Sequence, residues 1–467
     1  DAWRTVLPLP LPDLRPDDSF FDFGGSLLLV ELTKVLEELS STRPTIAALL
    51  EDPTVAGMAR TLDSSSGGGP KFDPKAQAVK FTLDTNVDVK VPPETVLDDY
   101  RRKPKKSIFL TGATGFLGVY VMRSLCRRPE VETVFCLVRA ADDERATARL
   151  RRTCQTRRMK LGGADGSWFS KVVVVCGDLS SPGLGIAGDD RHRLVGSVDM
   201  VAHIGAEVNW VKPYASMVDS NVGGTKGALE LAAEAHAAHL FASSITASAG
   251  PDQFQTGYRQ GKEVSEILCA RAVEELDVPS AVMRFGDIGA AEEAIAAGEV
   301  GTLPEDDFMM ILLRACATLG IYPDVPWAIS IMSVAGLADF VSEAIVSAPA
   351  SEFVSTPRDI KSKLVSWRQM WLWIGDLLPV QKCPVDDWKA ALADAATQGV
   401  EIVIRLLLVL PMVEGYLAHE GKRFEAGDGA EEELPSIDAA WAQGVASIIA
   451  KEVSPPPAKA PCCCAIS

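Results

Sequence analysis

The chain has 467 residues, of which 47% are apolar and 23% are charged, and its formal net charge is −17. This length is typical of two or three domains, and the composition is that of an ordinary globular protein. The acidic balance excludes a general nucleic-acid-binding surface, because such a surface must present basic residues to the phosphates.

Ten cysteines and five histidines are present, but no two cysteines stand in a CxxC pair and no zinc-ligand spacing occurs. We therefore expect buried, reduced thiols, no metal, and a cytoplasmic protein. No signal peptide opens the chain, and its first residue, Asp1, indicates a piece cut from a longer polypeptide. The longest apolar run, 402–413, is too short to span a bilayer and predicts a buried helix.

Residues 1–63 are predicted to form a small domain of short helices. Apolar residues from Leu27 to Val35 recur with helical spacing. A run of serine and glycine at 64–69 is typical of a flexible linker. We extend this linker over residues 64–106, where the sequence stays polar until a basic stretch ends it.

From residue 107 onward, short apolar strands alternate with helices. The strands are expected at 107–110, 134–138, 172–175, 198–203 and 239–242. This alternation predicts an α/β domain over 107–290, built on a doubly wound parallel sheet of the Rossmann type. After about Gly289 the alternation ends, and we expect a helical substrate-binding region at 291–455 and a disordered tail at 456–467.

A glycine-rich turn, TGATGFLG, joins the first strand to the following helix. The chain must turn sharply here while its backbone approaches a pyrophosphate, and a side chain at the glycine positions would block that approach. The helix N-terminus adds N–H groups and a partial positive charge. Because the motif follows a strand and opens a helix, it predicts a dinucleotide site. Its candidate residues are Thr111, Gly112, Thr114, Gly115, Phe116, Leu117 and Gly118.

The second strand is followed by Arg139, about twenty residues after the turn. An acid here would bind the ribose hydroxyls of NAD, whereas an arginine suits the 2′-phosphate of NADP, so we expect NADPH. The alternative is a solvated surface arginine. Arg149 is a second candidate for the phosphate. Asp178, after the third strand, would either accept a hydrogen bond from the adenine amino group or cap a helix.

Tyr258 and Lys262 stand four residues apart and therefore lie on one face of a helix. Reduction of a carbonyl needs a proton donor beside the hydride donor, and a neighbouring ammonium would lower the pKa of the phenol toward that task. The same lysine would hold the nicotinamide ribose. Upstream, Ser244 ends a strand, where its hydroxyl would bind the substrate oxygen, with Ser243 and Thr246 as alternatives.

The segment from about Ser107 to at least Ala344 resembles the thioester reductase domains that end some nonribosomal peptide synthetases, carboxylic acid reductases and aminoadipate reductases. The motifs that carry the resemblance are the glycine turn, Cys136–Arg139, Gly177–Leu179, His203–Trp210, Pro213–Tyr214, Asn221–Thr225, the Tyr258–Lys262 pair and Tyr322–Trp327. The resemblance implies that hydride from NADPH attacks a thioester carbonyl, with Tyr258 and Ser244 stabilising the oxyanion and Tyr258 delivering a proton. An aldehyde is then released, and a second reduction would give an alcohol.

Residues 17–28 resemble the attachment motif of peptidyl carrier domains, in which a serine at a helix start carries 4′-phosphopantetheine. By this resemblance Ser26 is the attachment site and is loaded by a phosphopantetheinyl transferase. The substrate is then an acyl or peptidyl thioester on the arm, supplied by an upstream adenylation domain. The family has one more residue between its glycine pair and the serine, so an alternative register places Leu27 at the serine position and makes the carrier inactive.

The reductase segment departs from the family at three places. The stretch from Ser244 to Tyr258 is short, Gly261 and Glu263 replace a small polar residue and an aromatic one beside the lysine, and Arg284-Phe285-Gly286 lacks the usual proline. Two other functions therefore stay open. One is a short-chain-type reductase or epimerase acting on a free carbonyl or acyl-CoA beside a non-functional carrier remnant, and the other is a non-catalytic binding module.

The chain ends Cys464-Ala465-Ile466-Ser467, which matches a prenylation signal, and Cys462 and Cys463 precede it. Two lipids would anchor the protein to a membrane, whereas one lipid binds only weakly. The alternative is a chance cluster of cysteines on a disordered end. We expect membrane association only if this tail is lipidated.

Overall fold

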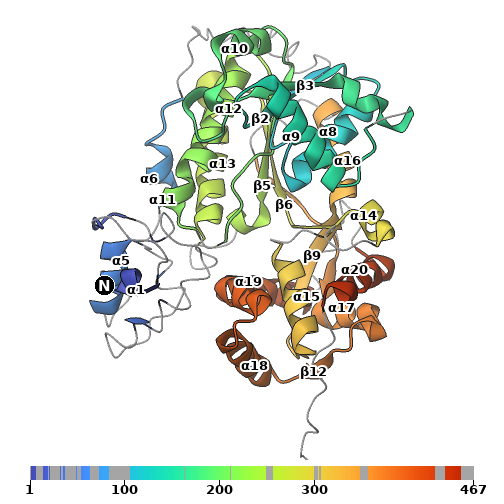
Figure 1. Cartoon of the computed structure of the whole chain (residues 1–467). Helices are drawn as coiled ribbons and strands as arrows, with labels where there is room; N and C mark the ends of the chain where they lie inside the picture. The colour runs from blue at the N-terminus through green and yellow to red at the C-terminus, as the bar shows by residue number, and fades with distance from the viewer. Residues whose placement is uncertain are drawn as a thin grey trace, which may run out of the picture.

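A seven-stranded sheet organises the chain (Figure 1). The computed structural model describes residues 2–6, 14–18, 20, 32, 35–36, 49, 54–63, 73–83, 106–161, 164–210, 212–248, 256–298, 303, 307–347, 356–425 and 437–453. The strand order is β10-β6-β5-β4-β1-β2-β3, and every neighbouring pair is parallel. The strands are β1 Ser107–Thr111, β2 Thr133–Val138, β3 Val172–Cys176, β4 Met200–His203, β5 Ala238–Ser244, β6 Ser280–Phe285 and β10 Arg358–Ile360.

The expected Rossmann-type sheet is confirmed, and the five expected strands correspond to β1 to β5. These strands are continuous apolar runs because both of their faces are covered by helices. In β2, for example, every residue after Thr133 is buried. The strand order reverses between β1 and β4, which is where doubly wound sheets bind their ligands, beyond the carboxyl ends of the strands.

Helices pack on both faces of this sheet (Figure 1). One face carries α8 Phe116–Arg127, α9 Asp143–Thr156 and α16 Val334–Ser347. The other carries α10 Gly188–Val195, α11 Tyr214–Val218, the π-turn Asp219–Gly223, α12 Gly224–Glu234 and α13 Gly257–Leu276. The buried side chains of each group form a separate apolar core against the strands. The loops at the carboxyl edge of the sheet are therefore supported by two packed layers.

The chain beyond 290 builds a second region, drawn below the sheet in Figure 1. Its apolar core also includes buried N-terminal residues such as Trp3, Phe20 and Met58. Its helices are α14 Glu292–Ala297, α15 Phe308–Leu319, α17 Trp367–Ile374, α18 Val385–Thr397, α19 Glu401–Glu425 and α20 Ala439–Glu452. Its short strands are β8 Ile321–Pro323, β9 Ala328–Ser333, β11 Leu364–Ser366 and β12 Gln381–Cys383, with β7 Asp287–Gly289 pairing to β9. Within the described ranges, no single helix has the length and apolarity needed to cross a bilayer; α19, bent by 63°, meets that test only when its two parts are taken together.

Two elements from beyond residue 290 return to the first domain. Strand β10 pairs with β6, and α16 packs against α8. A division at residue 290 therefore separates β10 from the sheet in which it pairs, and α16 from the helix layer on which it packs. The domain bounds stay a proposal. The sequence pattern missed β10 because the strand has three residues, two of them charged, and so shows no apolar run.

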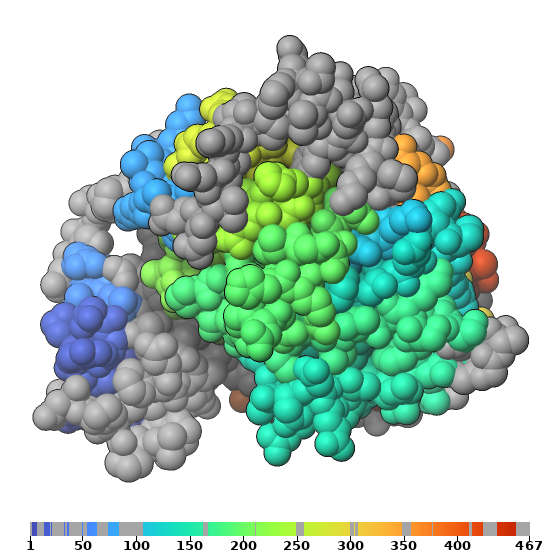
Figure 2. Space-filling view, turned by 90° about the horizontal axis from the view of Figure 1, so that it is seen from above, coloured from blue at the N-terminus to red at the C-terminus, as the bar shows by residue number. Residues whose placement is uncertain are grey.

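The N-terminal residues lie at one edge of the molecule, apart from the α8 and α9 layer (Figure 1, Figure 2). The longest described helices there are α1 Ala2–Val6 and α5 Val55–Asp63. The indole N–H of Trp3 donates to Sδ of Met58 at 3.3 Å, and the Trp3 ring packs edge-on against Phe20, with 5.2 Å between the ring centroids. These contacts join residues far apart in sequence, and their side chains belong to the same apolar cluster as the region beyond residue 290. Ser26 lies outside the described residues.

Part of the expected linker is a folded element bound to the sheet domain. Helix α6 Pro74–Ala78 begins at Asp73, whose carboxylate accepts hydrogen bonds from two backbone N–H groups of the first turn. Arg271 on α13 donates from Nη1 to the carbonyl oxygens of Ala78 and Phe81, each at 3.0 Å. The side chain of Ala78 is buried in the same core as α13. The chain is therefore fastened to the sheet domain well before β1.

Replacing Arg271 with alanine removes both of these hydrogen bonds and leaves two carbonyls at the end of α6 without a charged donor. We expect faster hydrogen–deuterium exchange at the backbone amides of residues 77–81, with the amides of the sheet unchanged. Arg193→Ala on α10 is the control, because the ion pair of Arg193 with Asp190 lies within α10 itself. Unchanged protection of α6 in the Arg271 variant would show that apolar packing suffices to hold it.

Candidate cofactor and catalytic site

The glycine turn after β1 is shaped by backbone contacts that leave no room for side chains. Gly112 has φ +77°, a left-handed conformation that disfavours other residues, and a Cβ there would lie 2.7 Å from the backbone of Gly205. A Cβ on Gly118 would overlap the carbonyl oxygen of Gly112. Backbone atoms of the turn therefore pack closely against each other and against the loop that follows β4. This is the cradle that a pyrophosphate needs, so these residues fit a dinucleotide.

The N-terminus of α8 opens at this turn. Gly115 occupies the capping position without a side-chain hydrogen bond, and it is exposed. Thr114 and Phe116 are partly exposed beside it, whereas Leu117 and Gly118 are buried in the first turn of the helix. The N–H groups of a twelve-residue helix thus face an accessible surface without a competing cap, which suits an anion.

Thr111 has a different position from its neighbours in the motif. It is fully buried, and its hydroxyl accepts a hydrogen bond from the Gly205 N–H at 2.9 Å and contacts Nδ1 of His203 at 2.8 Å. The other ring nitrogen of His203 lies 3.2 Å from the hydroxyl of Thr225. Burial holds the pKa of His203 well below its usual range, so the ring is neutral. The Thr111 side chain therefore supports the turn from beneath, and only its backbone is available to a ligand.

Arg139, Arg149 and Asp178 come together at the ends of β2 and β3. Nη1 of Arg149 donates to the carbonyl oxygen of Arg139 at 2.7 Å, and Nη1 of Arg139 lies 3.9 Å from Asp178. Burial acts to raise the pKa of Asp178, but hydrogen bonds from Ser180 and the two arginine charges outweigh it and hold the pKa below its ordinary value. Asp178 also accepts from the backbone N–H of Ser180 within a turn, whereas the next short helix begins after Ser181, so Asp178 caps this turn rather than a helix.

The expected catalytic residues meet at the end of β5. The ammonium group of Lys262 donates to the carbonyl oxygen of Ala242 and lies 5.7 Å from the centre of the Tyr258 ring. Burial lowers the pKa of Lys262 to about 8. Burial also raises the pKa of Tyr258 above its usual value, so the expectation that Lys262 lowers it is not met in this structure. The loss of hydration outweighs the neighbouring charge, and the phenol keeps its proton.

The three hydroxyls at the end of β5 have different environments. Ser243 is buried, and its Oγ donates to Glu266 at 2.5 Å. Thr246 is also buried, and its hydroxyl lies 2.9 Å from that of Ser244. Ser244 is the partly exposed member of the set. Its hydroxyl is therefore the one that a substrate oxygen can approach.

Two residues without a predicted role also lie in this region. Asn221 lies in the π-turn between α11 and α12, and its side-chain amide pairs with both backbone groups of Glu207, at 2.7 and 3.0 Å. Glu207 in turn accepts from Lys212 at 2.6 Å. Such π-turns cluster at functional sites, but the π-turn shows no residue pattern in the sequence.

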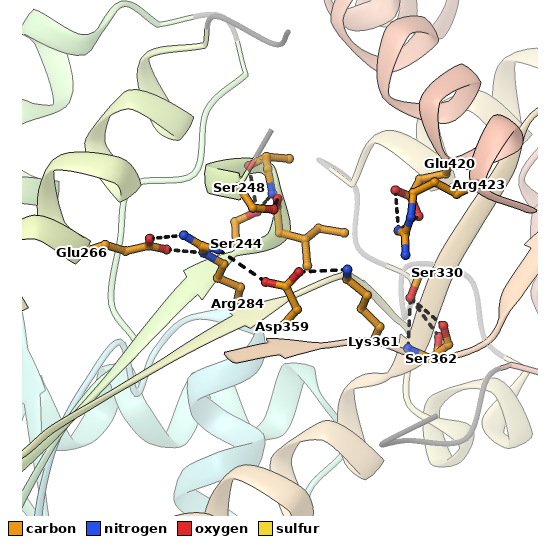
Figure 3. Close-up of polar contacts among 12 residues, drawn as sticks. Ser244, Ser248, Glu266, Arg284, Ser330, Asp359, Lys361, Ser362, Glu420 and Arg423 are labelled. Carbon is orange, nitrogen blue, oxygen red and sulfur yellow. Dashed lines mark hydrogen bonds and ion pairs between the residues drawn. The ribbon is translucent and has the colours of Figure 1, made fainter. Parts of the chain in front are cut away.

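The second region contributes aromatic and acidic side chains beyond β6. The rings of Trp210 and Phe308 lie 5.6 Å apart, and that of Phe308 lies 6.2 Å from Tyr416 on α19. The Tyr416 hydroxyl donates to Asp287 at 2.7 Å, and burial raises the pKa of Asp287 well above its usual value. Burial also raises the pKa of Asp307 to about 6. Figure 3 views this area, with Ser244 near the end of β5 and the Glu420–Arg423 pair on α19.

The family to which the chain belongs follows from two sequence profiles. The profile described as "Male sterility protein" matches residues 110–253 and 245–345, which together make up half of the chain. The chain belongs to this family. A second profile, "Phosphopantetheine attachment site", matches residues 1–62. The expected combination of a phosphopantetheine carrier domain and an NAD(P)-binding thioester reductase domain, as found in nonribosomal peptide synthetases and aminoadipate reductases, is thereby confirmed.

Named relatives agree with this assignment. The chain is 31% identical over 375 residues to a linear gramicidin synthase of Brevibacillus parabrevis, a match that covers 75% of this chain and 7% of the relative. It is 31% identical over 365 residues to L-2-aminoadipate reductase of Schizosaccharomyces pombe, a match that covers 70% of this chain and 25% of the relative. The chain thus corresponds to a minor part of the length of each of these proteins.

Solved structures show the same fold. The terminal R domain of the myxalamid PKS-NRPS pathway superposes with a TM-score of 0.65 at 25% identity, covering 82% of this chain and 99% of that one. A thiolation-reductase di-domain from an archaeal non-ribosomal peptide synthetase superposes with a TM-score of 0.63 at 15% identity, covering 97% and 96%. The second likeness concerns the fold alone, but it extends over both domains.

The glycine cradle can be tested by a matched pair of substitutions. Gly118→Ala forces a Cβ onto the Gly112 carbonyl, so we expect a stability loss of about 1–3 kcal/mol and weaker NADPH binding. Gly188→Ala, at the first residue of α10, is the control, because no atom lies within 4 Å of its added Cβ. Thermal unfolding and NADPH titration of both variants give the two readouts. Wild-type affinity in Gly118→Ala would contradict the assignment of the cradle.

Proposed function

We propose that this protein uses NADPH to reduce an acyl or peptidyl thioester held on its own carrier domain, and releases the product as an aldehyde. The observation that carries the proposal is the position of Lys262, between the end of β5 and the ring of Tyr258, on the same edge of the sheet as the glycine cradle. A carrier domain in the same chain supplies the reason for a thioester substrate.

The protein side chains prepare the site for proton transfer and oxyanion binding. When bound, NADPH supplies the hydride. The phenol of Tyr258 keeps its proton because of burial, which suits a donor to the oxygen of a carbonyl under reduction. Lys262 remains largely charged at neutral pH and would hold the nicotinamide ribose. Ser244, partly exposed, would donate a second hydrogen bond to the same oxygen.

The choice of NADPH over NADH rests on two arginines, Arg139 directly after β2 and Arg149 within α9. Arg139 is 71% exposed, and its guanidinium lies 3.9 Å from Asp178, its one ion pair among the described residues, so it is available to a phosphate. Arg149 is fixed beside it by the Arg139 carbonyl. Two cations near the adenosine end of the site favour a 2′-phosphate.

Substitution of Arg139 by alanine is expected to weaken NADPH binding about tenfold, because it removes a charge-assisted hydrogen bond. NADH binding should change little, so the ratio of the two dissociation constants is the decisive readout. Arg152→Ala is the control, since this exposed arginine lies on α9, the helix that carries Arg149. Equal losses for both cofactors in Arg139→Ala would argue against a phosphate contact.

The carrier chemistry is proposed from the family. Ser26 is the proposed attachment site of 4′-phosphopantetheine, loaded by a phosphopantetheinyl transferase, and an upstream adenylation domain would charge the arm. The shortened Gly24-Gly25-Ser26 loop favours one alternative, in which the carrier is inactive and the reductase acts on a free carbonyl or acyl-CoA. A mass increase on Ser26 after incubation with a transferase and coenzyme A would separate the two.

The reaction is tested by following NADPH oxidation with a panel of acyl-pantetheine thioesters while trapping the aldehyde. We expect Tyr258→Phe to reduce turnover by a factor of about 10²–10⁴ with NADPH affinity kept, because it removes a proton donor and no phosphate contact. Tyr322→Phe is the matched control, since Tyr322 stacks on Trp371 in the second region. NADPH binding without turnover on any thioester would shift the assignment to a free-carbonyl substrate or a binding module.

A further inference from the structure

Glu266 lies one helical turn after Lys262 on α13, and it is more than nine-tenths buried. Arg284 on β6 donates two hydrogen bonds to this carboxylate. Its Nε lies 2.8 Å from one oxygen, and its Nη2 lies 2.6 Å from the other. Ser243 on β5 donates a third hydrogen bond to the first oxygen. Figure 3 shows the Glu266 and Arg284 side chains pointing toward each other. The carboxylate is therefore fully engaged and cannot rotate away.

The arginine continues this network across the sheet. Nη1 of Arg284 lies 3.6 Å from Asp359 on β10, and Asp359 lies 2.8 Å from Lys361. The charges alternate from Glu266 to Lys361 (Figure 3). The network thus joins α13, β5, β6 and β10, and it holds Glu266 in place on the side of the sheet that carries Lys262.

Stability alone does not explain this arrangement. A buried ion pair loses hydration on folding, and apolar residues of similar volume often serve a fold as well or better. The pair also adjoins the residues that define the site. Ala242, which accepts from Lys262, directly precedes Ser243, which donates to Glu266, so α13 is tied to two successive residues of β5. This placement points to a role at Lys262.

The groups that face Lys262 differ in their charge. His203 on β4 and His239 on β5 have pKa values lowered by burial, so both rings are neutral at pH 7. Burial raises the pKa of Cys269 to about 12, so this thiol on α13 is neutral as well. Tyr258 keeps its proton. Burial lowers the pKa of Lys262, and Glu266 is the ionised group that opposes this effect.

We propose that Glu266, held by Arg284 and Ser243, is a positioning residue that keeps Lys262 charged in the pH range where the protein binds NADPH. This inference rests on the proposed function in one respect, that Lys262 contacts the cofactor. Arg284 serves to hold the acid in place through its two hydrogen bonds, whereas Glu266 supplies the charge that acts on the ammonium. The two members of one ion pair thus have different electrostatic effects on the lysine.

The test is NADPH affinity as a function of pH in the full chain, measured by fluorescence titration between pH 6 and 10. In the wild type, affinity should fall as pH rises through about 8, where Lys262 loses its charge. Glu266→Gln should move this midpoint down by about one pH unit, because an opposite charge near the ammonium is lost. Arg284→Gln breaks the same ion pair but keeps the acid, so its midpoint should stay at or above that of the wild type.

Two controls complete the design. Glu274→Gln, on the exposed part of α13, should leave the profile of the wild type unchanged. Should Glu266→Gln fail to fold, the double variant Glu266→Gln, Arg284→Gln replaces the pair with two amides and is compared with Arg284→Gln alone. These two proteins differ only at Glu266, and the double variant should have the lower midpoint.

The outcomes separate the inference from the proposed function. A uniform loss of affinity in Glu266→Gln with an unshifted midpoint would mean a structural role only and would overturn the inference. A shifted midpoint in a protein that reduces no thioester would support the inference and remove the proposed reaction. Absence of NADPH binding by the wild type at every pH would overturn both.

Discussion

Two backbone turns meet where the strand order of the sheet reverses, and the rest of the site depends on how closely they approach. Gly112 follows β1 and Gly205 follows β4, and neither position has room for a Cβ atom. The buried hydroxyl of Thr111 binds the loop of Gly205 and, through His203, connects to Thr225 on α12. Because this network is neutral and fully buried, it holds the turn rigidly without placing a charge beneath the pyrophosphate.

Helix α13 is fixed to the same sheet by polar as well as apolar contacts. Lys262 and Glu266 bind two successive residues of β5, so α13 cannot slide along the strand without breaking both contacts. Burial then shifts the pKa values of three titratable groups nearby. It keeps Tyr258 protonated and His203 neutral, and it brings Lys262 close to losing its charge. The same low-dielectric environment therefore stabilises the neutral phenol of Tyr258 and destabilises the charged ammonium of Lys262.

Much of the fold and of the candidate site could be predicted from the sequence. The features that the sequence did not predict have physical reasons. The strands β1 to β5 and the glycine turn are local patterns, so apolar runs and spacing suffice to find them. Strand β10 has no such pattern and exists only because β6 offers it an edge. The shift in the pKa of Tyr258 was predicted with the wrong sign, because burial is a tertiary property while Lys262 is visible four residues away. The role of Ser243 also depends on a partner on another element, Glu266.

The docking of α6 on α13 determines how far the carrier can travel. Since Arg271 fastens the chain at Ala78 and Phe81, the carrier is joined to the reductase by residues 64–72 rather than by all of 64–106. Fully extended, nine residues span about 30 Å, at ~3.3 Å each. A tether of this length confines the carrier near its own reductase at an effective concentration on the order of millimolar. If the carrier delivers a thioester as proposed, delivery within one chain would therefore outcompete delivery from a neighbouring molecule at ordinary protein concentrations.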